Sequence, residues 1–199
     1  MHKVFISFHH KNDEWAKESL LEFNAKYKIF IDASVDTNDI DENLPDESIR
    51  TIIRDEYLKD STVTIVLVGT ETKKRKHVDW EIYSSMYDGK VNKKSGILVI
   101  TLPVIKEFSS ITAAHPEEKQ HLYSDIQSWT TYTKEDHEIH SPYLPERIIE
   151  NLVCPTAKIS VTKWGKLTAI NLDLMIDLAF KARHSNNYDL STKMRRRNS

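Results

Sequence analysis

The sequence has little of what several large classes of protein require. Its 199 residues include four glycines and six prolines, too few for a collagenous or low-complexity chain. It also contains no glycine-rich run of the kind that holds a phosphate in dinucleotide-binding folds. A single cysteine, Cys154, excludes an internal disulfide and a zinc site made of several cysteines. We expect Cys154 to be buried, as small apolar residues commonly are.

The sequence also lacks a large excess of charge of one sign and has no long hydrophobic run. The 28 basic and 30 acidic residues give a formal net charge of -2, so no overall positive field attracts nucleic acid or an anionic membrane. The longest apolar run, 63–68, is far shorter than the roughly 20 residues of a membrane-spanning helix. The N-terminus has no apolar segment of the secretory kind. These absences predict a cytoplasmic protein that has neither nucleic acid nor a membrane as a partner.

What is present, over the first hundred residues, is an alternation of short β-branched runs with segments of helical period. This pattern is typical of an α/β fold in which a parallel sheet carries helices on both faces. The predicted strands are 3–8, 28–32, 62–68 and 96–100, with a helix in each interval. The third strand is apolar on both faces, so we place it at the centre of the sheet. Asn12 or Asp13 is expected to cap the first helix.

The remainder of the chain predicts an elaboration of the same domain rather than a second domain. After the core at 3–103, residues 104–183 combine short helical and strand patterns and end in an apolar helix. Beyond that helix apolar residues are few, so 184–199 is expected to be a flexible tail. The predicted organisation is therefore a single domain over 1–183.

Side chains that can carry chemistry follow the first and third predicted strands. A flavodoxin-like strand order brings the carboxyl ends of these strands together at the ligand crevice. The residues there are Phe8, His9, Gly69 and Thr70, with Glu81 in the next helix at the same edge. They lack the acids by which a phosphorylated receiver holds magnesium and the small hydroxyl-rich loop that wraps the phosphate of FMN, so both classes are disfavoured. No third ligand stands at a recognisable spacing from the tandem histidines, so we predict no metal.

Four segments together resemble a known family. They are Val4–His9, Phe30–Ser34, Ser61–Gly69 and Asp79–Ile82. In this order and spacing they are similar to the TIR-like proteins of bacterial Thoeris antiphage systems, the ThsB type, over residues 3–103. Residues 144–148 also look like part of the wider family. The resemblance implies a flavodoxin-like TIR fold with a C-terminal helical elaboration.

The same resemblance implies an enzyme that has NAD as its substrate and needs no cofactor. Such an enzyme is an NAD glycohydrolase or ADP-ribosyl cyclase. When phage infection is sensed, it makes a cyclic or conjugated ADP-ribose signal for a separate effector protein. The essential acid of the family falls on Glu81. One carboxylate suits this chemistry, because nicotinamide is a cationic leaving group and the difficult part is stabilising an oxocarbenium-like ribose.

The same resemblance implies further contacts with the substrate. Phe8 and His9 would lie beside the nicotinamide or its ribose, where an aromatic face attracts a cationic ring, although core packing suits Phe8 equally well. Asp32, Ser34 and Asp36 begin the loop that in TIR domains helps to form the pocket and the contacts between protomers. An acidic solvated loop is the alternative interpretation of these three residues.

One position departs from the pattern of the family. Many NAD-cleaving TIR domains carry a tryptophan four residues before the glutamate, whereas this chain has His77 there and Trp80 beside Glu81. Adjacent helical residues point about 100° apart, so we expect Trp80 to pack inward rather than replace the missing ring. His77 is included in the predicted substrate site together with Gly69 and Thr70.

Self-association is expected to control the activity. The segment 32–47 contains seven acidic and no basic residues, and it could meet the basic run 73–76 of a second protomer. Alternatively, the basic run attracts the pyrophosphate of NAD or is an exposed charged loop. Two other functions stay open at this point. One is a nucleoside deoxyribosyltransferase-like enzyme, which also cleaves an N-glycosidic bond with a glutamate, and the other is a TIR scaffold or sensor without catalysis.

Overall fold

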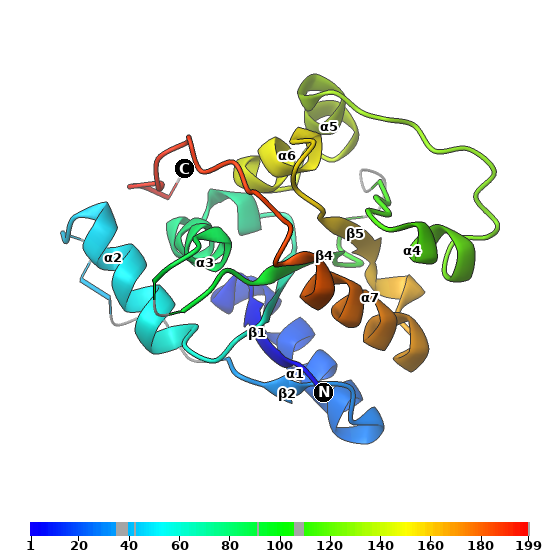
Figure 1. The fold of residues 1–199 in the computed structure, drawn as a ribbon, viewed down its shortest axis with the longest axis horizontal. Helices are drawn as coiled ribbons and strands as arrows, with labels where there is room; N and C mark the ends of the chain where they lie inside the picture. The colour runs from blue at the N-terminus through cyan, green and yellow to red at the C-terminus, as the bar shows by residue number, and fades with distance from the viewer. Residues whose placement is uncertain (35–39, 42, 91, 106–109, 199) are drawn as a thin grey trace.

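The computed structural model describes residues 1–34, 40–41, 43–90, 92–105 and 110–198 (Figure 1). Over these residues, five parallel strands form one sheet in the order β2-β1-β3-β4-β5. The strands are β1 (Lys3–Ser7), β2 (Ile31–Asp32), β3 (Val63–Val68), β4 (Gly96–Thr101) and β5 (Ser160–Lys163). The predicted α/β, flavodoxin-like architecture is confirmed, and β3 lies at the centre of the sheet as expected.

Helices cover both faces of the sheet. One face carries α1 (His10–Tyr27) and α7 (Ala169–Ala182), and the other carries α2 (Asp46–Ile52), α3 (Lys76–Met86) and α6 (Glu146–Val153). A π-helical turn (Ile53–Tyr57) extends α2, and short 3₁₀ turns occupy Thr72–Lys74 and Trp164–Lys166. On the side of β5 lie α4 (Pro116–His121) and α5 (Lys134–His140) (Figure 1). In the described parts of the chain, every helix is too short or too polar to span a bilayer.

The alternation of side chains along each strand divides the core between the two faces. In β1, Val4 and Ile6 pack against α1 and α7, whereas Phe5 packs against α2 and α3. β3 and β4 are buried along their whole length because helices cover both sides, which explains their continuous apolar runs. Ser7 follows Phe5 by two positions, so its side chain also faces α3.

Two local expectations are corrected by the structure. Because α1 begins directly after β1, its cap is His9, whose Nδ1 accepts a hydrogen bond from the Asn12 backbone N–H at 3.2 Å. Asn12 and Asp13 are already inside the helix. Cys154 is partly exposed rather than buried, because it directly follows α6 in a surface turn, where its Sγ lies 3.3 Å from Thr156 Oγ1.

The elaboration contains a helix that the sequence pattern did not predict, α5. Its start is a capping box in which Thr133 Oγ1 accepts a hydrogen bond from the Asp136 N–H at 3.2 Å. In return, Asp136 Oδ2 accepts from the Thr133 N–H at 2.9 Å. The helix has seven residues, which is too short for a helical period to stand out in the sequence.

The end of the chain differs from the flexible tail that the sequence predicted. The C-terminal segment, 186–198, runs along α6 and α3 toward α2 and is red in Figure 1. Tyr188 and Met194 are buried in the core, and the Trp80 indole N–H donates to the Arg195 carbonyl at 2.7 Å. A few apolar side chains therefore anchor a polar segment, each in a separate gap of the tertiary structure. Such isolated anchors leave no periodic pattern in the sequence.

Candidate active site at the carboxyl edge of the sheet

The predicted acid, Glu81, lies at the carboxyl end of β1. It projects from the middle of α3, and the Ser7 hydroxyl donates a hydrogen bond to its Oε2 at 2.6 Å. Both side chains are buried, with 2% of Glu81 and 0% of Ser7 exposed. A bond of this length is at the short, strong end for a hydroxyl donor and a carboxyl acceptor. Glu81 is therefore a buried and oriented carboxyl group and not a solvated residue of a helix surface.

Phe8 and His9 lie at the same edge, and Phe8 packs on the opposite face of the sheet from Glu81. Phe8 belongs to the core cluster between the sheet and α1. Ser7 and Phe8 are neighbours in an extended chain, so their side chains point to opposite faces of the sheet. His9 is occupied at the start of α1 as its cap. The sequence interpretation missed Ser7, although the same period-two alternation places it on the α3 face.

A second buried carboxyl group joins the ends of β1 and β3 at this edge. Asp13, in the first turn of α1, is 4% exposed, and its Oδ2 accepts a hydrogen bond from the Thr72 hydroxyl at 3.1 Å. The Gly69 N–H donates to the same hydroxyl oxygen at 2.8 Å. Burial raises the pKa of Asp13, while the Thr72 hydrogen bond and the nearby His9 act in the opposite direction.

Gly69 is required here because the Asp13 carboxyl group approaches its backbone closely. A Cβ added at Gly69 would lie 2.5 Å from Asp13 Oδ1, a distance that real Cβ atoms do not tolerate. The predicted site residue Gly69 therefore has a packing role at the edge. Asp13 and Thr72 were not predicted to belong to the site, because their contact joins positions 59 residues apart.

Of the residues predicted to form the site at and after β2, Ser34 contacts β1. Ser34 Oγ accepts a hydrogen bond from the Ile6 N–H at 3.0 Å, one residue before Ser7. The Ser34 N–H donates to Asp32 Oδ1 at 3.0 Å, and Asp32 itself is exposed at the sheet edge. Asp36 lies outside the described residues. The structure thus places Ser34 against the backbone of β1.

Thr70 lies in the loop that precedes α3, and His77 lies in the first turn of that helix. Thr70 is partly exposed in the loop after β3, and His77 is partly buried in the first turn of the helix. The His77 ring stacks on Trp80, with 4.9 Å between ring centroids and 22° between ring planes. Trp80 is 1% exposed and packs in the cluster that contains Phe5. The prediction that Trp80 packs inward is confirmed.

The edge offers carboxyl, hydroxyl and amide groups for chemistry. Within the ranges that the structure describes, no group of three or more His, Cys, Asp or Glu side chains is placed to hold a metal ion. The arrangement can set one carboxyl group, oriented by Ser7, against a positive charge that develops on a substrate. Glu81 is covered by protein in this structure.

The fold and this edge define the class of the protein, a TIR-like domain. The family model described as "Thoeris protein ThsB, TIR-like domain" matches residues 5–107, just over half of the chain. The chain belongs to this family, and so to the Thoeris system of antiphage defence. Glu81, Ser7 and the Asp13–Thr72 pair all lie within the matched residues. A search of curated proteins gave no match.

Proposed function

We propose that the protein is an NAD-consuming enzyme of Thoeris defence in which Glu81 stabilises the ribose as its bond to nicotinamide breaks. The product is a cyclic or conjugated ADP-ribose that activates a separate antiphage effector. The observation that carries this proposal is the buried hydrogen bond of 2.6 Å between Ser7 and Glu81 at the carboxyl end of β1.

The charge balance of the reaction explains why one carboxylate is enough. The bond that breaks joins C1′ of the ribose to the ring nitrogen of nicotinamide. The bonding electrons leave with nicotinamide, which becomes neutral, and the positive charge passes to the ribose. The enzyme therefore has to place negative charge beside the ribose and has no proton to supply to the leaving group. A buried carboxylate does this more strongly than an exposed one, because less water screens its charge.

Self-association enters the proposal through access to Glu81. Since the carboxyl group is covered, NAD reaches it after neighbouring segments move. We infer that contact between protomers, through the acidic segment 32–47 and the basic run 73–76, produces this movement. Light scattering and NAD turnover should rise together with protein concentration, and both should fall when Asp36 and Asp39 are changed to Lys. Full turnover by a strictly monomeric sample would exclude this part of the proposal.

The direct test is to incubate the purified protein with NAD, alone and with lysate from infected cells, and to analyse the products by mass spectrometry. Release of nicotinamide with an ADP-ribose product is expected, and Glu81→Gln should abolish both. A parallel incubation with a deoxynucleoside and a free base tests the other N-glycosidic chemistry. Base exchange there, with NAD left intact, would contradict the proposal.

A TIR scaffold or sensor without catalysis is the second candidate, and the environment of α3 favours it. The position four residues before Glu81 carries His77, whose ring stacks on Trp80. The aromatic residue of the family's usual pattern is therefore absent from this position. A lack of NAD turnover in a sample shown to be assembled would establish this second function in place of the first.

A further inference from the structure

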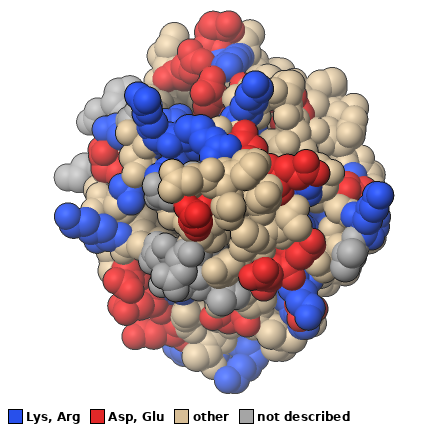
Figure 2. Space-filling model, turned by 90° about the vertical axis from the view of Figure 1, so that its left-hand side faces the viewer, with Lys and Arg blue, Asp and Glu red and all other residues tan. Residues whose placement is uncertain are grey.

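A cavity of about 510 Å³ lies between α3, α6 and the C-terminal segment. Basic side chains from two distant stretches of the chain line it. They are Lys73 and Arg75 before α3, and Lys193, Arg195, Arg196 and Arg197 in the C-terminal segment. Figure 2 shows Lys and Arg side chains gathered on part of the face that carries the C terminus. The wall of this cavity is strongly basic, although the whole chain has a net charge of -2.

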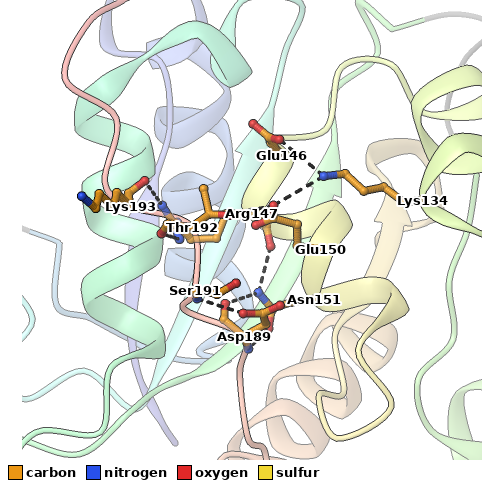
Figure 3. A network of polar contacts seen from close by, with 9 residues as sticks. All are labelled: Lys134, Glu146, Arg147, Glu150, Asn151, Asp189, Ser191, Thr192 and Lys193. Carbon is orange, nitrogen blue, oxygen red and sulfur yellow. Dashed lines mark hydrogen bonds and ion pairs between the residues drawn. The ribbon is translucent and has the colours of Figure 1, made fainter.

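The cavity borders α3 through Val78 and Asp79, and Thr72 of the candidate site also lines it. Asp79, which lines the cavity, precedes Glu81 by two residues, so the two side chains point about 200° apart around the helix. Asp79 accepts hydrogen bonds from Arg147 Nε at 2.9 Å and Nη2 at 3.2 Å. The other acid of the wall, Glu146, pairs with Lys134 at 3.4 Å (Figure 3). Both acids of the described wall are thus already paired with cations.

The backbone that carries the basic side chains is held in place. Arg147 is buried, and its Nη1 and Nη2 donate to the carbonyl oxygens of Thr192 and Lys193 at 3.0 and 3.2 Å (Figure 3). Farther along the segment, Arg196 forms an ion pair with Asp46 of α2. Cations on a fixed backbone lose less conformational entropy on binding an anion than the same cations on a mobile tail. The structure therefore presents a preorganised basic site.

We propose that this cavity binds a diphosphate anion, either free pyrophosphate or the diphosphate group of a nucleotide. Arginine suits such a ligand because its planar guanidinium donates to two phosphate oxygens at once, and lysine adds a compact charge. The volume lies within the range of about 300–1,000 Å³ that is usual for small-molecule sites. The described residues of the wall are all non-aromatic, so the recognised group is the phosphate rather than a stacked base.

Titration calorimetry on the full-length protein tests this inference, with pyrophosphate and ADP as probes at about 0.15 M salt. Saturable binding that weakens as the salt concentration rises is expected. The paired variant Lys73→Gln with Lys193→Gln should weaken binding about tenfold, because it removes one cation from each side of the cavity. The matched control is Lys59→Gln with Lys90→Gln. It removes the same charge before β3 and after α3, away from the cavity, and should leave affinity unchanged.

The outcomes are distinct. Equal affinity for pyrophosphate and ADP would show that the diphosphate group alone is sufficient for binding. Tighter binding of ADP would identify a nucleotide as the ligand, and either result supports the site. Absence of saturable binding to both probes overturns the inference, as does equal weakening by the control pair. Tighter binding of a short single-stranded oligonucleotide, lost in the Lys73/Lys193 variant, would also overturn it. None of these measurements depends on NAD cleavage.

Discussion

The two faces of α3 carry a buried carboxyl group, Glu81, and a partly buried one, Asp79. Toward β1, Glu81 accepts a hydrogen bond from the uncharged Ser7 hydroxyl. Toward α6, Asp79 is paired with the buried guanidinium of Arg147 and also accepts from the Arg195 N–H at 2.8 Å. A guanidinium neutralises a carboxylate, whereas a hydroxyl donor orients it. The Ser7 hydrogen bond orients the candidate catalytic acid, and the Arg147 ion pair holds the structural one.

The largest effect is expected on the Glu81 face. Glu81→Gln keeps the size of the side chain and an acceptor for Ser7 but removes the negative charge, so nicotinamide release should fall by more than about 100-fold, or about 3 kcal/mol in the barrier. The thermal unfolding midpoint should stay close to that of the wild type. Glu138→Gln, at an exposed position of α5, is the matched control and should have no effect on release. Unchanged release in Glu81→Gln would remove this residue from the mechanism.

The opposite face should respond in stability. Arg147→Ala leaves Asp79 and the carbonyls of Thr192 and Lys193 without their cationic donor, so the free energy of unfolding should fall by about 3 kcal/mol in urea titration. Amide hydrogen exchange should also become faster across 186–198.

Lys134→Ala is the control for Arg147→Ala, because it breaks the surface ion pairs of Lys134 with Glu146 and Glu150 and should lower stability far less than Arg147→Ala does. Equal losses of stability in the two variants would show that the buried pair does not anchor the C-terminal segment.

A smaller loss is expected where Gly69 meets Asp13. Gly69→Ala puts a methyl group against the Asp13 carboxyl group and should lower the free energy of unfolding by about 2 kcal/mol. Gly165→Ala is the control, since a Cβ there has no neighbouring atom within 4 Å. Combining Gly69→Ala with Asp13→Ser should cost less than the sum of the two single changes. Strict additivity in this double-mutant cycle would contradict the close contact.

The smallest effect is the pH dependence of Asp13. Burial raises its pKa above the ordinary value of 3.8, so the folded protein binds this proton more tightly than the unfolded chain does. The stabilising contribution is complete below the unfolded pKa and is lost as pH rises through the folded pKa. Asp13→Asn cannot titrate, so its free energy of unfolding should rise relative to wild type over that pH range, by less than the cost of Gly69→Ala. Parallel curves against pH would show that burial does not shift this group.

The sequence pattern predicted best the strands that are buried along their whole length. The bounds of β3 and β4 agree with the prediction to within one residue at each end. β2 was predicted as five residues and has two. The strand is shorter because the Asn24 side chain occupies the backbone before it. Asn24 Oδ1 accepts hydrogen bonds from the N–H groups of Ile29 and Phe30, and the chain pairs with β1 only after them. A β-branched run does not reveal such a competitor for its backbone.

The sequence by itself determined the order of the elements, the apolar face of each, and the arrival of Glu81 at the carboxyl edge, because these follow from local period and strand order. Only the tertiary structure decided that the Ser7 hydroxyl donates to Glu81. It also decided that Asp13 pairs with Thr72, and that Arg147 holds the C-terminal segment against α3 and α6. In each case a buried polar group has to find a partner far away in the chain. Leaving the group unpaired costs free energy, but no local pattern records which distant residue satisfies it.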